Sequence, residues 1–249
     1  MNVGASVLLG LAGVPVGAFL NVVVERTPDR TPLRAVVEGD AHPPRSWLGV
    51  PVQPWLLRGS VGGRRLPRWL AVELATVVVF AALGGRYGDT TVVIPLLVLG
   101  AGLVAASAVD LEHLRIPDRI TFPTLAVAVP VMVAVSASHH LTGALRGAMV
   151  GSISFFVLLL VPHLVYPRGM GFGDVKLALL MGLYLGWLGW EPDAQVIGPV
   201  RLVLNSLVLG CFLGVVFGLV HAAATRRRGE FPFGPALASA CLIVVIWGA

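Results

Sequence analysis

Long apolar runs constrain this chain more than any other feature of its sequence. About eight runs alternate with polar turns, and most approach the roughly 20 residues that a helix needs to cross the hydrocarbon of a membrane. Their approximate bounds are 3–24, 69–83, 91–109, 120–137, 141–165, 175–190, 200–224 and 235–247. Runs this long and continuous do not fit the strands of a membrane barrel. We therefore predict an all-α polytopic membrane protein with about eight transmembrane helices.

The composition agrees with this class and excludes an ordinary soluble domain. Hydrophobic residues make up 56% of the 249 residues and charged residues only 12%, whereas soluble domains carry about 25% charged residues. The net charge of +5 does not predict a nucleic-acid partner, because the arginines are spread over loops without interleaved aromatic residues. The cysteines, Cys211 and Cys241, both lie in apolar runs, so no metal site is predicted.

The distribution of basic residues predicts the orientation of the spans. With the amino terminus outside, fifteen of the eighteen Lys and Arg residues face the cytoplasm, and the exceptions are Arg86, Arg146 and Arg201. This is a strong positive-inside bias. The cytoplasmic side then holds residues 25–68, 111–119, 166–174 and 226–228.

We expect three segments along the chain. Residues 1–24 form a first transmembrane helix, residues 25–68 a longer cytoplasmic loop, and residues 69–249 a transmembrane bundle. The loop is too small to bury a large core and shows little helical periodicity. Its prolines are Pro28, Pro32, Pro43, Pro44, Pro51, Pro54 and Pro67.

Two aspartates at the edges of apolar runs are the candidate catalytic residues. Asp110 ends one run and Asp174 opens another, and the predicted threading puts both at the cytoplasmic edge. Ionisable groups near hydrocarbon usually face a protein interior or a water-filled cavity. Two carboxylates held close share a proton, because both cannot be ionised cheaply. Such a pair can hydrolyse a peptide bond: the ionised partner activates a water, and the protonated partner supports the oxyanion and helps the amine to leave.

Four neighbouring residues are supporting candidates. Gly171 and Gly173 lack side chains and would leave room for a substrate backbone beside Asp174, for which we also expect a helix-capping role. Asp118 is expected either to cap the following helix or to support the pair. Lys176, the only lysine of the chain, would either extend to the membrane interface or favour the ionised form of Asp174.

Four short motifs occur in order along nearly the whole chain. Residues 17–28 (GAFLNVVVERTP) are similar to a G-S-F-L-N-V-V-I-x-R-x-P opening, and residues 110–118 (DLEHLRIPD) to a D-x-x-x-x-x-I-P-D segment. Residues 171–176 (GFGDVK) match G-x-G-D-x-K, and residues 233–235 match F-G-P. Together these motifs resemble the prepilin peptidases, the type IV leader peptidases that are membrane aspartic proteases.

The resemblance implies an enzymatic activity, its partners and a cellular location. Carried over by position, it makes Asp110 and Asp174 the catalytic aspartates of a membrane endopeptidase that needs no cofactor for cleavage. The expected reaction removes the basic leader of type IV prepilin-like precursors after a glycine, before a hydrophobic helix that stays in the bilayer. The implied partners are prepilin or pseudopilin precursors and the lipid bilayer, with no nucleic acid. The implied location is the bacterial cytoplasmic (inner) membrane, with the active site on its cytoplasmic side.

The first loop departs from the family pattern. Many members carry two zinc-binding cysteine pairs there and also methylate the new amino terminus with S-adenosylmethionine. Residues 25–68 contain no cysteine, so no zinc is expected. Residues 50–59 and 69–74, which include Glu73, still resemble the family, so an N-methyltransferase activity that uses S-adenosylmethionine stays open.

The sequence leaves two other functions open. In a proton- or ion-coupled transporter, the same carboxylates would bind ions beside a broken helix. Against this, both aspartates lie at span ends, and no inverted repeat is visible. An inactive paralogue that acts as an assembly factor is the other alternative, although the chain keeps both aspartates.

Overall fold

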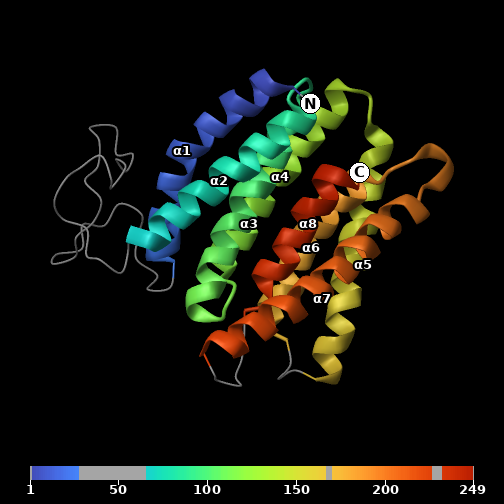
Figure 1. Ribbon diagram of the computed structural model, residues 1–249. Helices are drawn as coiled ribbons and strands as arrows, with labels where there is room; N and C mark the ends of the chain where they lie inside the picture. The colour runs from blue at the N-terminus through green and yellow to red at the C-terminus, as the bar shows by residue number, and fades with distance from the viewer. Residues whose placement is uncertain (1, 28–65, 167–169, 226–231, 249) are drawn as a thin grey trace. The chain divides into compact units, whose positions relative to one another are not determined.

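The computed structural model describes residues 2–27, 66–166, 170–225 and 232–248. Within these ranges the chain forms eight α-helices and one short 3₁₀ turn, with no strand (Figure 1). The predicted all-α fold is confirmed. Most of the predicted loop 25–68, including the stretch 50–59, and the arginines at 226–228 lie outside the described residues.

One compact unit, Met1–Val93, holds two of the helices, α1 (Val3–Arg26) and α2 (Leu66–Tyr87). They run antiparallel, since Gly13 of α1 faces Val77 of α2 and Gly17 faces Glu73. An ideal Cβ at Gly17 would lie 2.8 Å from the Cα of Glu73. The backbones of α1 and α2 therefore approach each other so closely at these glycines that no side chain would fit between them. Such glycine contacts are common between membrane helices.

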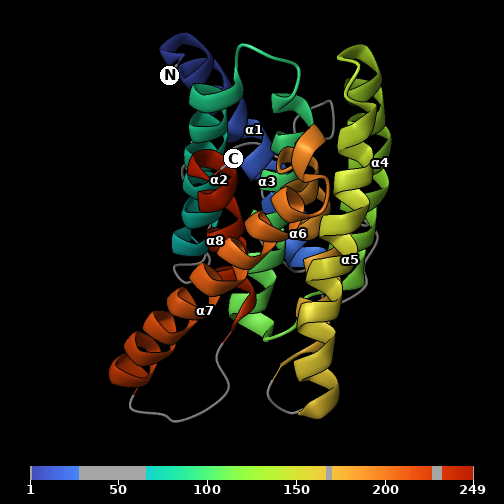
Figure 2. The same ribbon diagram turned by 90° about the vertical axis from the view of Figure 1, so that its right-hand side faces the viewer.

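The second compact unit, Ile94–Ala249, is built around a short central helix. Its helices are α3 (Val93–His113), α4 (Asp118–Ser138), α5 (Thr142–Val165), α6 (Phe172–Leu188), α7 (Ile197–Thr225) and α8 (Gly234–Trp247), with the 3₁₀ turn η1 (Pro192–Ala194) before α7. Helix α6 contacts α4, α5, α7 and α8 (Figure 2). Eleven of its 17 residues are buried, so protein rather than lipid surrounds most of this helix, which is shorter than a typical membrane span.

Close packing and two buried hydrogen bonds fix how α6 is rotated about its axis. An ideal Cβ at Gly151 of α5 would lie 2.6 Å from the Cα of Gly186, so α5 and α6 touch through their backbones. The Tyr184 hydroxyl donates to the Pro95 carbonyl oxygen at 2.8 Å, and the Trp187 indole N–H donates to Ser136 Oγ at 2.9 Å. Buried polar groups strongly prefer such partners, so these bonds also set the direction in which the first turn of α6 points.

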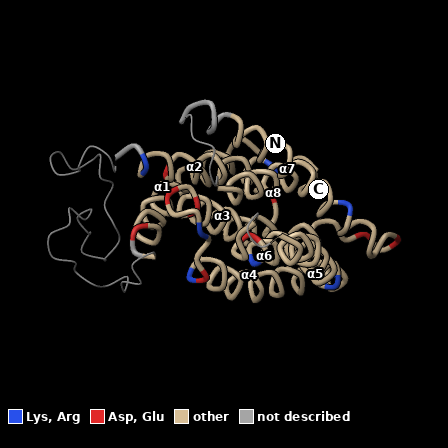
Figure 3. The backbone as a smooth tube through the Cα atoms, turned by 90° about the horizontal axis from the view of Figure 1, so that it is seen from below, with Lys and Arg blue, Asp and Glu red and all other residues tan. Residues whose placement is uncertain are grey.

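The helices have the length and composition of a multi-pass membrane protein. Among the described residues, six helices are long and apolar enough to cross a bilayer: α1, α2, α3, α4, α5 and α7. Helix α8 is apolar but has only 14 residues. Figure 3 shows few charged positions along the described helices, as expected for segments that avoid placing charges in hydrocarbon.

Candidate active site

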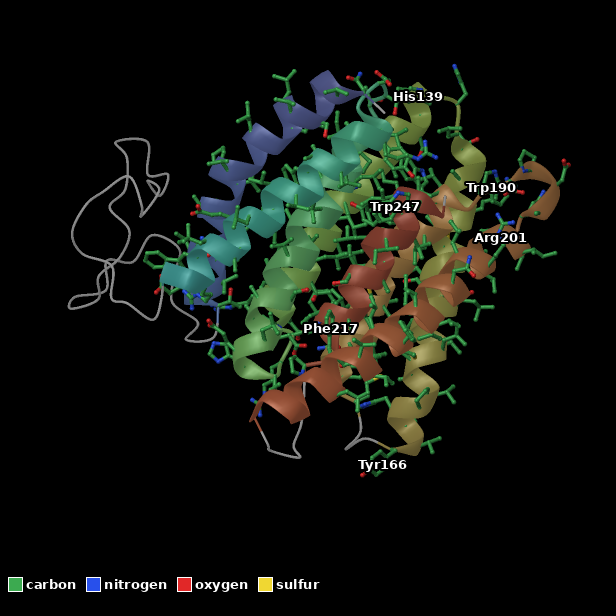
Figure 4. The ribbon with its side chains drawn as sticks, in the orientation of Figure 1. His139, Tyr166, Trp190, Arg201, Phe217 and Trp247 are labelled. Carbon is green, nitrogen blue, oxygen red and sulfur yellow. The ribbon has the colours of Figure 1, made fainter. Side chains whose placement is uncertain are left out.

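The helix ends that carry the predicted site residues lie at one end of the second unit. His139, just after α4, and Trp190, shortly after α6, lie toward one end, whereas Tyr166, just after α5, lies at the other (Figure 4). Helices α4 and α6 therefore both begin at the Tyr166 end. This arrangement brings Asp118 and Asp174 to the same end of the unit.

Asp110 lies near the end of α3 and is 5% exposed. Its Oδ2 accepts a hydrogen bond from the backbone N–H of Gly234, the first residue of α8, with an N···O distance of 3.0 Å. An ideal Cβ at Gly234 would lie 2.7 Å from the same oxygen. Glycine therefore allows this close approach, because a Cβ here would push the carboxylate out of its present position or move α8 away from it.

Asp174 lies in the first turn of α6 and is 7% exposed. Asp110 is close enough to it for the two carboxylates to interact electrostatically. Oδ1 of Asp174 is buried and has no hydrogen-bond partner among the described residues. The structure thus brings the two aspartates together, while their catalytic role stays a prediction.

The capping role expected for Asp174 is wrong. The N-cap of α6 is Gly171, which makes no side-chain capping bond, and the helix already begins at Phe172. Asp174 is therefore an internal residue of the first turn, where a negative charge is still favoured by the helix dipole. Its backbone N–H donates to the Gly171 carbonyl at 3.1 Å.

The two glycines of the predicted turn have different surroundings. An ideal Cβ at Gly173 would lie 2.9 Å from the Cβ of Ile116 and 3.1 Å from its carbonyl oxygen. Gly173 therefore lets α6 pack against the segment between α3 and α4, and the space that was expected to admit a substrate is filled by Ile116. An ideal Cβ at Gly171 would have Asp174 Oδ2 as its nearest described neighbour, at 3.6 Å, which is an ordinary contact. There is therefore room beside the carboxylate at Gly171.

Lys176 binds Asp118, not Asp174. Its Nζ lies 2.7 Å from Oδ1 and 2.9 Å from Oδ2 of Asp118. The N-cap of α4 is Pro117, so the expected capping by Asp118 is wrong: the helix begins at Asp118 itself, and the carboxylate forms an ion pair with α6. The ammonium group also lies 5.1 Å from the centre of the Phe172 ring and 5.7 Å from that of Phe122, within cation–π range.

Sequence reasoning missed several residues of this end of the unit. The Phe172 ring lies 5.3 Å from the His163 ring, and His163 Nδ1 lies 2.9 Å from the Met170 carbonyl oxygen. No spacing rule links His163 on α5 to residues of the next helix. Gly234 belongs to the F-G-P motif, so a signal for it existed, although the motif does not reveal its bond to Asp110.

The residues that the structure describes offer little to a metal ion. They contain no group of three or more His, Cys, Asp and Glu side chains that could hold one. Cys211 lies on α7 and Cys241 on α8, and the loop 25–68 contains no cysteine. The donor set for a zinc ion held by cysteine thiolates is therefore lacking.

The first unit has a separate buried polar cluster, formed by Asn21 of α1 and Trp69 and Glu73 of α2. The Asn21 side-chain amide donates to the Trp69 carbonyl at 3.2 Å and to Glu73 Oε1 at 3.4 Å. All three residues are buried, and both Asn21 Oδ1 and the Trp69 indole N–H have no partner among the described residues. The cluster thus offers one acceptor and one donor to a further polar group.

Comparison with known proteins places the chain in a family. Residues 97–219, which include both aspartates, match the model of the type IV leader peptidase family. A prepilin leader peptidase/N-methyltransferase of Pseudomonas aeruginosa is 32% identical over 96% of this chain and 89% of its own length. The chain belongs to the type IV leader peptidase family. Together with its apolar helices, this family membership identifies the chain as a membrane protease.

Other members of the type IV leader peptidase family have similar sequence identity to the chain. Proteins with the same name from Aeromonas hydrophila and Myxococcus xanthus are 30% and 31% identical, over 97% and 90% of this chain. The alignments cover 90% and 65% of those two relatives. No solved structure matches the chain.

Proposed function

We propose that this protease removes the basic leader of prepilin-like precursors, cutting after a glycine that precedes a hydrophobic helix. Asp110 and Asp174 are the catalytic residues. The observation that carries the proposal is the meeting of two buried carboxylates, one of which has an oxygen with no partner among the described residues. The names of the relatives supply the substrate class.

The pair suits water activation without a metal. Two neighbouring carboxylates hold one proton between them, since ionising both would place two negative charges side by side, which costs free energy. The ionised group takes a proton from water, whose oxygen attacks the peptide carbonyl. The protonated group stabilises the oxyanion and then protonates the departing amine. The open space at Gly171 supports access of the scissile peptide to Asp174.

The position of the site in the membrane supports the same reaction. Fifteen of the eighteen basic residues lie on the side of the membrane that holds both aspartates in the proposed threading. We therefore assign the active site to the cytoplasmic edge of a bacterial inner membrane. A transporter would favour carboxylates near the midplane of the bilayer, whereas Asp110 lies near the end of α3 and Asp174 near the start of α6.

Methylation of the new amino terminus is a second activity to test, because the relatives are named N-methyltransferases as well. S-adenosylmethionine, when bound, would supply the methyl group. The polar cluster of the first unit fits a polar ligand through Asn21 Oδ1 and the Trp69 indole N–H. Zinc held by cysteine thiolates does not fit, and no step is assigned to it.

Coexpression with a prepilin-like precursor tests the peptidase directly. The wild-type protein is expected to convert the precursor to a shorter product, seen as a mobility shift and confirmed by mass spectrometry. Asp110→Asn and Asp174→Asn should leave the precursor intact, while Asp193→Asn, an exposed aspartate of η1, should cleave normally. Full cleavage by either of the first two variants contradicts the proposed pair.

A further inference from the structure

We propose that the two aspartates have fixed and different roles: Asp110 is the ionised member that activates water, and Asp174 carries the proton. This assignment rests on the proposed peptidase function. It comes from the different hydrogen-bonding surroundings of the two carboxylates.

Asp110 supplies the acceptor at the start of α8. Pro235, the second residue of the helix, has no N–H, and the N–H groups of Ala236 and Leu237 donate to the Phe233 carbonyl at 3.1 and 3.2 Å. Phe233, the N-cap, has no side-chain capping bond. The Gly234 N–H therefore depends on the carboxylate of α3, which it reaches at 3.0 Å. A helix amino terminus favours a negative charge on such an acceptor.

Asp174 also accepts a backbone hydrogen bond, from Gly171, but the rest of its surroundings disfavour a charge. Its Oδ1 is buried without a hydrogen-bond donor among the described residues, and burying an unpaired charge costs more than burying a neutral carboxyl. The only lysine of the chain lies two residues away, but two hydrogen bonds hold it on Asp118. The first turn of α6 favours an anion at Asp174 as well, yet the field of a helix end is weaker than the desolvation of an unpaired charge.

The assignment gives a balanced reaction. Asp110 removes one proton from water while the water oxygen bonds to the carbonyl carbon, and the proton of Asp174 hydrogen-bonds to the resulting oxyanion. When the C–N bond breaks, the nitrogen takes the proton of Asp174, and the products are a carboxylic acid and an amine. The proton left on Asp110 then passes to Asp174, which restores the starting state of the pair.

An ester substrate separates the two roles, since an alkoxide leaves without the proton that an amine needs. The probe is a synthetic peptide with a basic leader, a glycine and a hydrophobic segment, made either with the ordinary amide or with an ester at the cleavage position. Purified wild-type protein in detergent should cleave both. Asp174→Asn should lose amide cleavage but keep ester cleavage above the enzyme-free rate, and Asp110→Asn should lose both.

The outcomes distinguish this inference from the proposed function. If the wild-type protein cleaves neither peptide, the proposed peptidase function is wrong, and so are the roles assigned to Asp110 and Asp174. If the wild type is active and Asp110→Asn keeps ester cleavage while Asp174→Asn loses it, the function stands but the roles are reversed. Equal ester activity of the two variants also contradicts the assignment. Thermal unfolding of each variant checks that the fold is kept.

Gly234 is then a positioning residue, and its substitution gives a second test. In Gly234→Ala the new Cβ would lie 2.7 Å from Asp110 Oδ2, so kcat for both peptides should fall, on the order of tenfold, with KM unchanged. Gly210→Ala is the matched control, because its Cβ would lie 2.8 Å from Leu237 Cδ2, between α7 and α8 but on a flexible side chain. Equal kcat values for Gly234→Ala and Gly210→Ala contradict the role of Gly234.

Discussion

The ammonium group of Lys176 binds both carboxylate oxygens of Asp118, at 2.7 and 2.9 Å. This ion pair joins the first turn of α4 to Lys176 of α6, two residues after Asp174. The contact therefore helps to set the position of the Asp174 carboxylate.

Removal of this ion pair should weaken catalysis without abolishing it. The Asp118 side chain is 54% exposed, so the ion pair stabilises the present position of α6 by about 1 kcal/mol or less. If all of that free energy is lost from the transition state, Lys176→Met lowers kcat by about fivefold. Lys176→Arg should recover most of the loss. The measurement is kcat on a leader peptide, with Arg201→Met, which breaks the exposed Arg201–Glu191 pair, as the control. Complete inactivity of Lys176→Met would assign the lysine to the chemistry itself.

A side chain at Gly173 should displace the first turn of α6. The new Cβ would lie 3.1 Å from the backbone oxygen of Ile116 and 2.9 Å from its Cβ, and neither atom is a flexible side-chain end. We expect Gly173→Ala to lose activity and to cost about 1–3 kcal/mol of stability. Gly171→Ala meets only Asp174 Oδ2, at 3.6 Å, so it should lose less.

The check on this prediction is a paired measurement of cleavage rate and thermal unfolding in detergent. Gly4→Ala is the control, since its Cβ would meet only Asn2 Oδ1, at 3.5 Å. Wild-type activity in Gly173→Ala would show that Ile116 moves aside freely and that the close contact does not position Asp174.

Two residues with left-handed backbone allow a matched test of the loop beside Asp110. Leu114 has φ 52° between α3 and α4, and His140 has φ 58° between α4 and α5. Valine is strained in this region, so either substitution should cost about 1–2 kcal/mol of stability. Only Leu114→Val should also reduce the cleavage rate, because Leu114 connects Asp110 to Ile116. Equal cleavage rates in the two variants would show that this loop does not position the site.

The sequence predicted the number of helices and the meeting of the two aspartates, since both follow from where the apolar runs begin and end. It did not predict the ion pair of Lys176 with Asp118 or the contact of Gly173 with Ile116. These depend on how each helix is rotated about its axis. Helix α6 is apolar on nearly every side, so hydrophobic periodicity does not show which of its sides faces each neighbouring helix. Its rotation is instead set by the glycine contacts with α5 and by the Tyr184 and Trp187 hydrogen bonds.

The polar cluster of the first unit gives a prediction about methylation alone. Trp69→Phe keeps the aromatic ring and removes the indole N–H that has no partner among the described residues. If this donor holds the methyl-group cofactor, the variant should cleave the precursor normally but yield less methylated product. Mass spectrometry of the mature amino terminus measures both. A product that is unmethylated even with wild-type protein and S-adenosylmethionine present would mean that the chain is a peptidase only.

The proposed catalytic pair is tested most directly by a double-mutant comparison of cleavage rates. Purified wild type, Asp110→Asn, Asp174→Asn and the double variant would be compared on one amide leader peptide under single-turnover conditions. Residues that act as a unit are strongly non-additive. We predict that each single substitution abolishes cleavage nearly completely and that the double variant is no slower than either. A single variant that retains substantial activity, or two partial losses that multiply in the double variant, would show that Asp110 and Asp174 do not act as a catalytic unit.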